Sequence, residues 1–306
     1  MDREVGLTAP LPTSEAVGRL ALFFASAATR QGILARRALE RPAPDDEVLA
    51  HRLIREMHND APSVAISSSA IVPTVWRAHE LLDLGCGTEH PECGRVMAQV
   101  LELQGRPGAF SQGCSRTRHA HRVCEHFISG FFSPAPPEQR LAPVMLPNGK
   151  VFRAEPAARF AVSCLALRAA LRGRFNNRAS VERHFVSLLQ LSEQWTDWNG
   201  YFAGDAIVAG IHALACVSSL PAGMASKLAS IIATQQTADG SWPNADLFAT
   251  LEALLALRTP EAHAAVCRAI PALLSRQRQD GSFGSTAQQE RALIALRALI
   301  WAEQED

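Results

Sequence analysis

A short motif that recurs with a period of just over forty residues constrains this chain more than any other sequence feature. Residues 236–242 and 277–283 both contain glutamine, three further residues, glycine, serine and an aromatic ring, and they lie 41 residues apart. A third copy occupies residues 104–110, and degenerate copies contain Gly149 and Gly200. A fixed period of this length is typical of folds in which each repeat forms one supersecondary unit.

The residues after the glycines have the composition of buried helices. Alanine and leucine occur on nearly every face of these stretches, as expected of helices packed on two sides. They cover residues 155–171, 205–215, 246–257 and 287–301. More amphipathic stretches follow at residues 222–236 and 261–278, while strand signals are nearly absent. We therefore predict an all-α fold, an α6/α6 toroid in which inner helices line a central cavity and outer helices cover them.

The motif itself has a local physical explanation. Glycine permits the tight turn from an outer to an inner helix. The aromatic ring can pack between adjacent pairs, and the glutamine can tie the end of the outer helix to the next turn. The motif resembles the QW repeat of squalene–hopene and oxidosqualene cyclases, and the related repeat of protein prenyltransferase β subunits. The resemblance covers about residues 60–303 and implies a ring with a substrate cavity at its centre.

The catalytic motifs of these families have no counterpart in the sequence. Terpene cyclases that begin by protonation carry Asp-x-Asp-Asp, and protein prenyltransferases bind zinc through an Asp-x-Cys pair; neither pattern occurs here. Aromatic residues, which stabilise carbocations in such cavities, make up only 6% of the chain. The active-site residues must therefore be sought in the repeats themselves.

The length of the chain allows one ring with a small addition. A chain of 306 residues, 47% of them hydrophobic, can bury one large core. We assign residues 43–306 to the toroid and residues 1–42 to an N-terminal helical extension. The helical stretch at residues 14–40 could pack over one end of the ring as a lid, or could form a homodimer.

The net charge and the hydropathy of the sequence exclude some classes of binding partner. Thirty basic and thirty acidic residues give a net charge of zero, so we expect no nucleic-acid partner. The sequence lacks a signal peptide and an apolar run long enough to form a stable membrane span. We therefore expect a cytoplasmic protein whose partner is a small, largely apolar molecule.

Three carboxylates recur at the start of successive inner helices. Glu155, Asp205 and Asp246 lie five or six residues after the glycine of their repeats. They could simply cap their helices, because helix N-termini favour acidic side chains. Alternatively they converge at one mouth of the cavity and raise each other's pKa, which would make Asp205 or Asp246 a proton donor.

Further polar residues occur deeper in the same helices, where charge is costly unless it faces a cavity. His212 shares a face with Asp205 and is expected to act as its partner or as a base, so the catalytic candidates are Asp205, Asp246, His212 and Glu155. The candidates for substrate binding are Arg159, Glu252, Glu290, Trp76 and His121.

The second repeat is rich in cysteine and histidine. Cys114, His121 and Cys124 are candidate zinc ligands, although no compact Cys-x2-Cys spacing is present. Buried free thiols and surface histidines explain the same residues without a metal. No cofactor is required by the interpretation based on acid catalysis, and zinc is the one cofactor that the sequence suggests.

Three functions follow from these patterns. The first is a biosynthetic enzyme similar to terpene cyclases, an isomerase or lyase that uses an acid to cyclise or isomerise a small, largely apolar substrate. The scarcity of aromatic rings argues against long polyene cyclisation. The second is a zinc-dependent transferase or hydrolase on the same toroid, and the third is a noncatalytic binding scaffold.

Overall fold

The computed structural model describes residues 13–59, 70–87, 89–102, 141–195, 198, 204–217 and 220–304. Within these ranges the regular secondary structure is helical apart from one small hairpin and one isolated β-bridge, which confirms the all-α prediction. The outer helices are α1 (Thr13–Phe24), α3 (Asp46–Asn59), α5 (Pro91–Glu102), α8 (Ala179–Ser192), α10 (Ala222–Ala233) and α12 (Pro260–Leu274). The inner helices are α2 (Arg30–Ala38), α4 (Ile71–Asp83), α7 (Glu155–Arg172), α9 (Gly204–Ala215), α11 (Leu247–Leu257) and α13 (Gln288–Ala302).

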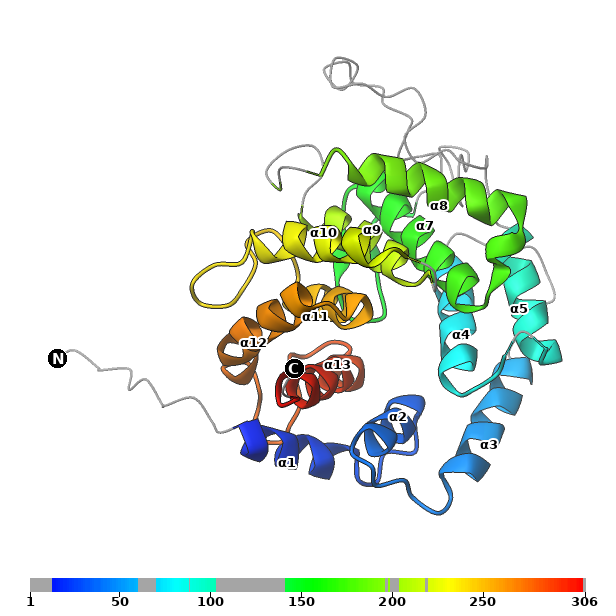
Figure 1. Ribbon diagram of the computed structural model, residues 1–306. Coiled ribbons are helices and arrows are strands. Elements are labelled where there is room, and N and C mark those ends of the chain that lie inside the picture. Colours follow the sequence, from blue (N-terminus) through cyan, green and yellow to red (C-terminus); the bar gives the residue numbers. More distant parts are fainter. Residues whose placement is uncertain are drawn as a thin grey trace.

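The inner helices form a closed ring. Each one packs against its two neighbours in the order α2, α4, α7, α9, α11, α13 and back to α2. Figure 1 shows α1, α3, α5, α8, α10 and α12 around the outside of this ring. Since inner and outer helices alternate along the chain, all six inner helices run in the same direction, and their N-terminal ends share one face of the toroid.

The first two helices belong to this ring, which differs from the division that the sequence predicted. Helix α2 packs between α13 and α4, and α1 packs against α2 and α13. The stretch at residues 14–40 is two helices because Thr29 starts the second one: its side chain accepts a hydrogen bond from the Gly32 amide at 3.2 Å. The pair α1 and α2 thus closes the toroid instead of extending from it.

The glutamine motif performs the structural role that the sequence predicted. The Gln236 amide donates to the carbonyl of Gly240 and to that of Ala265 in α12, both at 2.9 Å. The buried Trp242 ring donates from Nε1 to Ile232 at the end of α10. One side chain therefore joins its own turn to the next outer helix, and the aromatic ring anchors that turn to the preceding one.

The copy at residues 277–283 closes the ring in the same way. Gln277 donates to the carbonyl of Ala16 in α1 at 3.1 Å. Gly281 has φ +85°, and a Cβ atom there would approach the carbonyl oxygen of Arg19 to 2.7 Å. Only glycine satisfies both conditions, so this turn requires its glycine for conformation and for close approach. Helix α1 occupies the place relative to this turn that α12 occupies relative to the turn before it.

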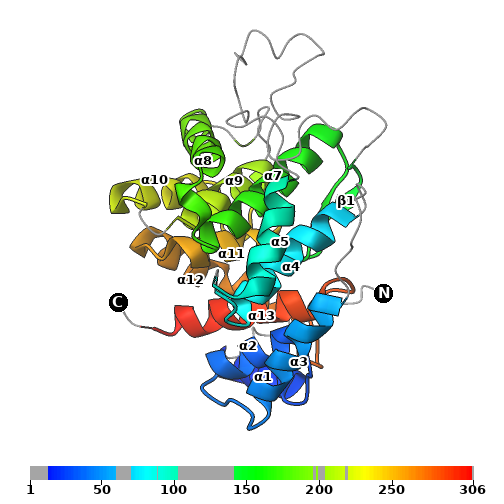
Figure 2. The ribbon, with the colours of Figure 1, turned by 90° about the vertical axis from the view of Figure 1, so that its right-hand side faces the viewer.

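The degenerate copy at Gly149 forms a hairpin instead of a turn between helices. Strands β1 (Val144–Met145) and β2 (Val151–Phe152) pair antiparallel, with Val144 opposite Phe152. The turn between them is closed by a bond from the Gly149 amide to the Leu146 carbonyl, and Gly149 has φ +84°. Figure 2 shows β1 at the end of the molecule where α13 begins. The hairpin therefore lies at the face that holds the N-terminal ends of the inner helices.

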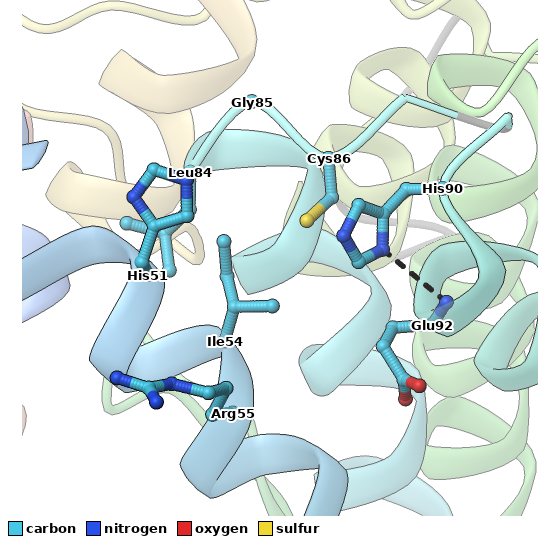
Figure 3. A pocket seen from close by; sticks show the side chains of 8 residues that line it. All are labelled: His51, Ile54, Arg55, Leu84, Gly85, Cys86, His90 and Glu92. Atoms are coloured by element: carbon cyan, nitrogen blue, oxygen red, sulfur yellow. Dashed lines mark hydrogen bonds between the residues drawn. The ribbon is translucent and has the colours of Figure 1, made fainter. Parts of the chain in front are cut away.

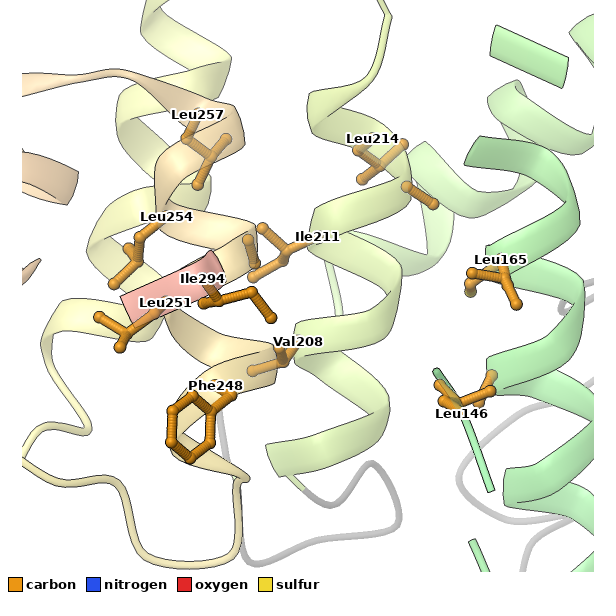
Figure 4. Packing of buried hydrophobic residues seen from close by; sticks show 14 of the residues in the cluster. Leu146, Leu165, Val208, Ile211, Leu214, Phe248, Leu251, Leu254, Leu257 and Ile294 are labelled. Carbon is orange, nitrogen blue, oxygen red and sulfur yellow. The ribbon is translucent and has the colours of Figure 1, made fainter. Parts of the chain in front are cut away.

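The core fills the space between neighbouring helices. Figure 4 shows side chains of α9 and α11 packed against each other, with Ile294 of α13 and Leu165 of α7 beside them. Val208, Ile211, Leu251 and Leu254 are all at most 2% exposed. This packing fixes the inner helices, so that the polar side chains among them are held in defined positions.

Candidate functional site

The hairpin lies at the N-terminal mouth of the ring and is held there by one ion pair and one hydrogen bond. The Lys150 ammonium binds one oxygen of Asp205 in α9. Arg291 of α13 donates to the carbonyl of Asn148 at 2.9 Å and lies 3.6 Å from a carboxylate oxygen of Asp246. The turn of the hairpin is thereby fastened to α9 and to α13, the two neighbours of α11 in the ring.

Both aspartates expected to act as acids are engaged in holding this mouth together. Asp205 accepts the Asp246 amide at 2.8 Å on the oxygen that Lys150 does not bind. Asp246 caps α11 by accepting the amides of Phe248 and Ala249 at 3.0 and 3.1 Å. The structure joins the two residues in a linked chain of caps and ion pairs.

A layer of three polar side chains lies below the hairpin. Arg168 of α7 binds Glu252 of α11 at 3.0 Å, and His212 of α9 lies 3.9 Å from the other oxygen of that carboxylate. These residues line the space on both sides of the layer. The space between the layer and the hairpin is about 30 Å³, roughly the volume of one water molecule.

The histidine of this layer is neutral. Burial lowers the pKa of His212 well below its ordinary value, and the charges of Arg168 and Arg172 lower it further. His79 of α4 shows the same shift for the same reasons, with burial as the first cause. Its ring is held by the Leu165 carbonyl and by Arg172, each at 2.9 Å. Both histidines in the middle of the ring therefore add no positive charge next to these arginines.

A cavity of about 530 Å³ opens on the other side of this layer. It has the size of a site for a small organic molecule. One face of α13 runs along it through Glu290, Ile294, Arg297 and Trp301, whose spacing of three or four residues places them on one stripe. Helix α11 contributes Leu255 and Ala256. The cavity wall is therefore partly apolar, and its charged residues lie at fixed positions along α13.

Glu290 lies at the inner end of this stripe and is 7% exposed. Its Oε2 binds the guanidinium of Arg30 and accepts from Gln31 at 3.0 Å, while its Oε1 has no partner among the described residues. Burial raises the pKa of Glu290 in spite of the opposing charge of Arg30. This carboxyl therefore combines a free oxygen with an environment that favours its protonated form.

The remaining acid in the cavity wall is fully engaged. Asp83, at the end of α4, binds Arg30 on one oxygen and Arg172 on the other, the second contact at 2.5 Å. Arg30 also lies over the ring of Trp76, 4.9 Å from its centre. Trp76 lines the cavity, and one of its faces is covered by this cation.

Two arginines at the outer end of the cavity have no such partner. Arg258 ends α11 in a left-handed conformation, with φ +51°, and Arg297 lies on the last turns of α13. Both are exposed. Neither forms an ion pair or a side-chain hydrogen bond within the part of the chain that the structure describes.

Glu155 and Arg159 lie apart from both central spaces. Glu155 accepts the amides of Leu141 and Ala142 at 2.8 to 3.1 Å, and it binds Arg159 one turn further along α7. These bonds lower the pKa of Glu155 in spite of its partial burial. The two residues fasten the segment before the hairpin, and the three acids do not converge as a group.

The candidate zinc ligands lie outside the described residues. Cys114, His121 and Cys124 all belong to the range that the structure leaves out, as does the motif copy at residues 104–110. In the described ranges, no three histidine, cysteine or acidic side chains are grouped as metal ligands. No helix in those ranges is long and apolar enough to cross a membrane.

A second hollow of about 620 Å³ lies at the edge of the ring, between α3 and the turn from α4 to α5. Figure 3 shows its lining, which includes His51, Cys86, His90 and Glu92. Burial raises the pKa of the Cys86 thiol, which disfavours the nucleophilic thiolate. None of the catalytic candidates lines this hollow, so the central cavity is the better candidate site despite its smaller volume.

The sequence analysis missed the cations of the site. Lys150, Arg168 and Arg172 each bind an acid or a histidine that faces the ring's centre. The two arginines lie in an otherwise alanine- and leucine-rich helix, so the same argument about costly buried charge would have found them. Lys150 could not be found in this way, because a hairpin at Gly149 was not expected.

The comparisons with known proteins support the fold. The sequence matches no protein-family model, and it matches no curated protein. Two solved structures of the type II terpene cyclase MstE from Scytonema superpose on the chain with a TM-score of 0.52 at 13% identity. One is an aspartate-to-alanine variant with the product merosterolic acid A, and the other is an aspartate-to-asparagine variant with the substrate geranylgeranyl dihydroxybenzoate. The matches cover 95% of this chain and 96% and 97% of those chains, so the fold is that of a type II terpene cyclase.

Proposed function

We propose that this protein is a terpene-cyclase-like enzyme that cyclises or isomerises a small prenyl substrate in the central cavity. The observation that carries the proposal is Glu290: a buried carboxyl with a raised pKa and a free oxygen, in the wall of a cavity of about 530 Å³. The likeness in fold to an enzyme that acts on a geranylgeranyl compound gives further support.

In this proposal Glu290 takes the acid role that the sequence analysis gave to Asp205 or Asp246. A general acid needs a proton and an open path to the substrate. Asp205 and Asp246 have both oxygens committed to Lys150, Arg291 and backbone amides. Glu290 has Oε1 free and lines the cavity.

The reaction adds and returns one proton. The Glu290 proton adds to the CH carbon of the terminal trisubstituted alkene, so that a tertiary cation forms. The next double bond closes a ring onto this cation, and loss of a proton to water leaves an isomer of the substrate. Solvent then returns a proton to Glu290. Trp76 and Trp301 are the tryptophans that the described residues place in the cavity wall. Arg30 covers one face of Trp76, and Trp301 lies about three helical turns from Glu290 along α13. Few aromatic faces are therefore available to a cation formed at Glu290, so we expect a monocyclic or rearranged product instead of a long cascade.

The test is incubation of the purified protein with farnesol, farnesyl diphosphate and geranylgeraniol in deuterated water, with products identified by mass spectrometry. A cyclised isomer that has gained one deuterium at the protonated carbon is expected, since the acid exchanges with solvent. A product without deuterium would overturn the acid mechanism. No product from any of the three probes, combined with a stably bound protein partner, would favour the binding scaffold.

A further inference from the structure

The two exposed arginines at the outer end of the cavity lie in a wall where every acid is already in contact with another arginine. Glu252 faces Arg168, Asp83 faces Arg30 and Arg172, and Glu290 faces Arg30. His212 adds no charge because its pKa is lowered by burial and by neighbouring arginines. Arg258 and Arg297 therefore remain as unmatched positive charge within the described part of the cavity wall.

The spacing along α13 relates this charge to Glu290. Arg297 lies seven residues after Glu290, two helical turns further along the same face, at an axial distance of about 10 Å. The residue between them on that face is Ile294, and Leu255 of α11 lines the same space. A molecule lying along this wall would meet a cationic end, an apolar middle and a carboxylic acid.

We propose that Arg258 and Arg297 bind the oxyanion of an amphiphilic substrate, whose apolar tail lies along Ile294 with its far end at Glu290. This inference rests on the proposed function, because Glu290 defines the reacting end. Guanidinium groups suit the task, since they stay charged and present paired donors to phosphate or carboxylate oxygens. A phosphate and a carboxylate share this chemistry, so the experiment includes both.

A purely structural role for the two arginines makes a different prediction. Arg258 follows the last residue of α11, where a cation is favoured by the helix dipole. Such a role would appear as a loss of stability on substitution, with no effect on ligand affinity. Exposed charges of this kind contribute little to stability, so the substituted proteins should fold and can be assayed.

The experiment is isothermal titration calorimetry of the full chain with farnesyl diphosphate, farnesoic acid and farnesol. We expect at least one of the two anionic probes to bind at least tenfold more tightly than farnesol. Arg258→Gln and Arg297→Gln should each weaken that anionic probe at least fivefold and leave farnesol unchanged. Arg183→Gln, on the outer helix α8, is the matched control and should change none of the three affinities.

Equal affinity for anionic and neutral probes would overturn the inference, and so would unchanged affinity in both arginine variants. Failure of the cyclase proposal is a separate result. Tight binding of the anionic probe that depends on Arg258 and Arg297, without any cyclised product, would retain the anion site and refute the chemistry. A deuterated product, combined with unchanged affinity of the Arg258→Gln and Arg297→Gln variants for both anionic probes, would retain the chemistry and refute the anion site.

Discussion

The two ends of the central ring carry the same kinds of residue in different states. At the N-terminal mouth, Lys150 and Arg291 are matched with Asp205 and Asp246, and about 30 Å³ remains inside. At the C-terminal end, about 530 Å³ is open, and the wall includes an acid with a free oxygen and two arginines without partners. Charged residues form ion pairs that close the ring at its N-terminal mouth, whereas charged residues at the other end remain accessible to a ligand.

The comparison shows why a charged residue on an inner helix is not enough to identify a site. Asp205, Asp246 and Glu290 all occur in the first turn or cap of an inner helix. What distinguishes Glu290 is the chain around it: Arg30 and Gln31 from α2 bind only one of its oxygens, and no hairpin residue reaches the other. Partners from another repeat of the ring therefore decide whether each carboxylate keeps a free oxygen.

The largest effect should come from removing the proton donor. Glu290→Gln keeps the size of the side chain and its bonds to α2, but it cannot donate the proton. We expect turnover to fall at least about a hundredfold, the lower range for loss of a general acid. The rate of cyclised product, measured with whichever probe reacts, checks this, with circular dichroism to show that the variant is folded.

Asp246→Asn is the matched control at the other end of the ring. Asparagine is as good an N-cap as aspartate, so α11 should keep its first turn. Turnover should stay within about threefold of the parent, because the residue only closes the mouth. A hundredfold loss in this variant, with Glu290→Gln still active, would return the acid role to the sequence prediction.

The next largest effect concerns stability at the sealed mouth. Lys150→Met removes the ammonium and leaves the Asp205 carboxylate, 18% exposed, without its cation. We expect a loss of about 2 kcal/mol in the free energy of unfolding, typical of a hydrogen bond to a charged group in a largely buried position. Urea denaturation measures it. A loss below about 0.5 kcal/mol would show that the hairpin is not held by this pair.

The buried histidines between the two ends should make stability depend on pH. Their pKa values are lowered in the folded state, so protonation favours unfolding. The contribution is complete above about pH 6.5, the ordinary value, and is lost as pH falls below it, by at most about 1.4 kcal/mol per pH unit for each histidine. Urea denaturation of His212→Gln between pH 7 and 5 should show a smaller slope than the parent protein. An equal slope would mean that His212 is charged in the folded protein.

The repeat made the ring predictable from sequence, and the exceptions have local causes. Gln236 and Gln277 make the predicted contacts because their turns depend on residues within each motif. The stretch at residues 14–40 is divided into α1 and α2 by a single polar residue, Thr29, and α2 packs between α13 and α4. The sequence around Gly149 matched the motif in part, yet two short strands pair there, and their pairing depends on contacts with α9 and α13.

The sequence could identify candidate residues for the site, but not the partners that each of them binds. Period and spacing placed His212 and Glu252 at one depth, and the structure brings them within 3.9 Å. The partners of each acid come from other repeats, as with Arg30 and Glu290, which are 260 residues apart. A free oxygen on Glu290, or a missing partner for Arg297, depends on such distant contacts, which no local pattern encodes.

The smallest predicted effect is a difference in stability between substitutions of two arginines in the same helix. Arg291 and Arg297 both belong to α13, but Arg291 binds the Asn148 carbonyl, faces Asp246 and lies 5.0 Å from the centre of the Phe248 ring. Arg291→Gln should therefore cost about 1 kcal/mol of unfolding free energy, while Arg297→Gln should stay within about 0.5 kcal/mol of the parent. Urea denaturation of both proteins in one buffer measures the difference. If the two substitutions cost the same, the distinction between a closed and an available end of the ring would not hold for its arginines.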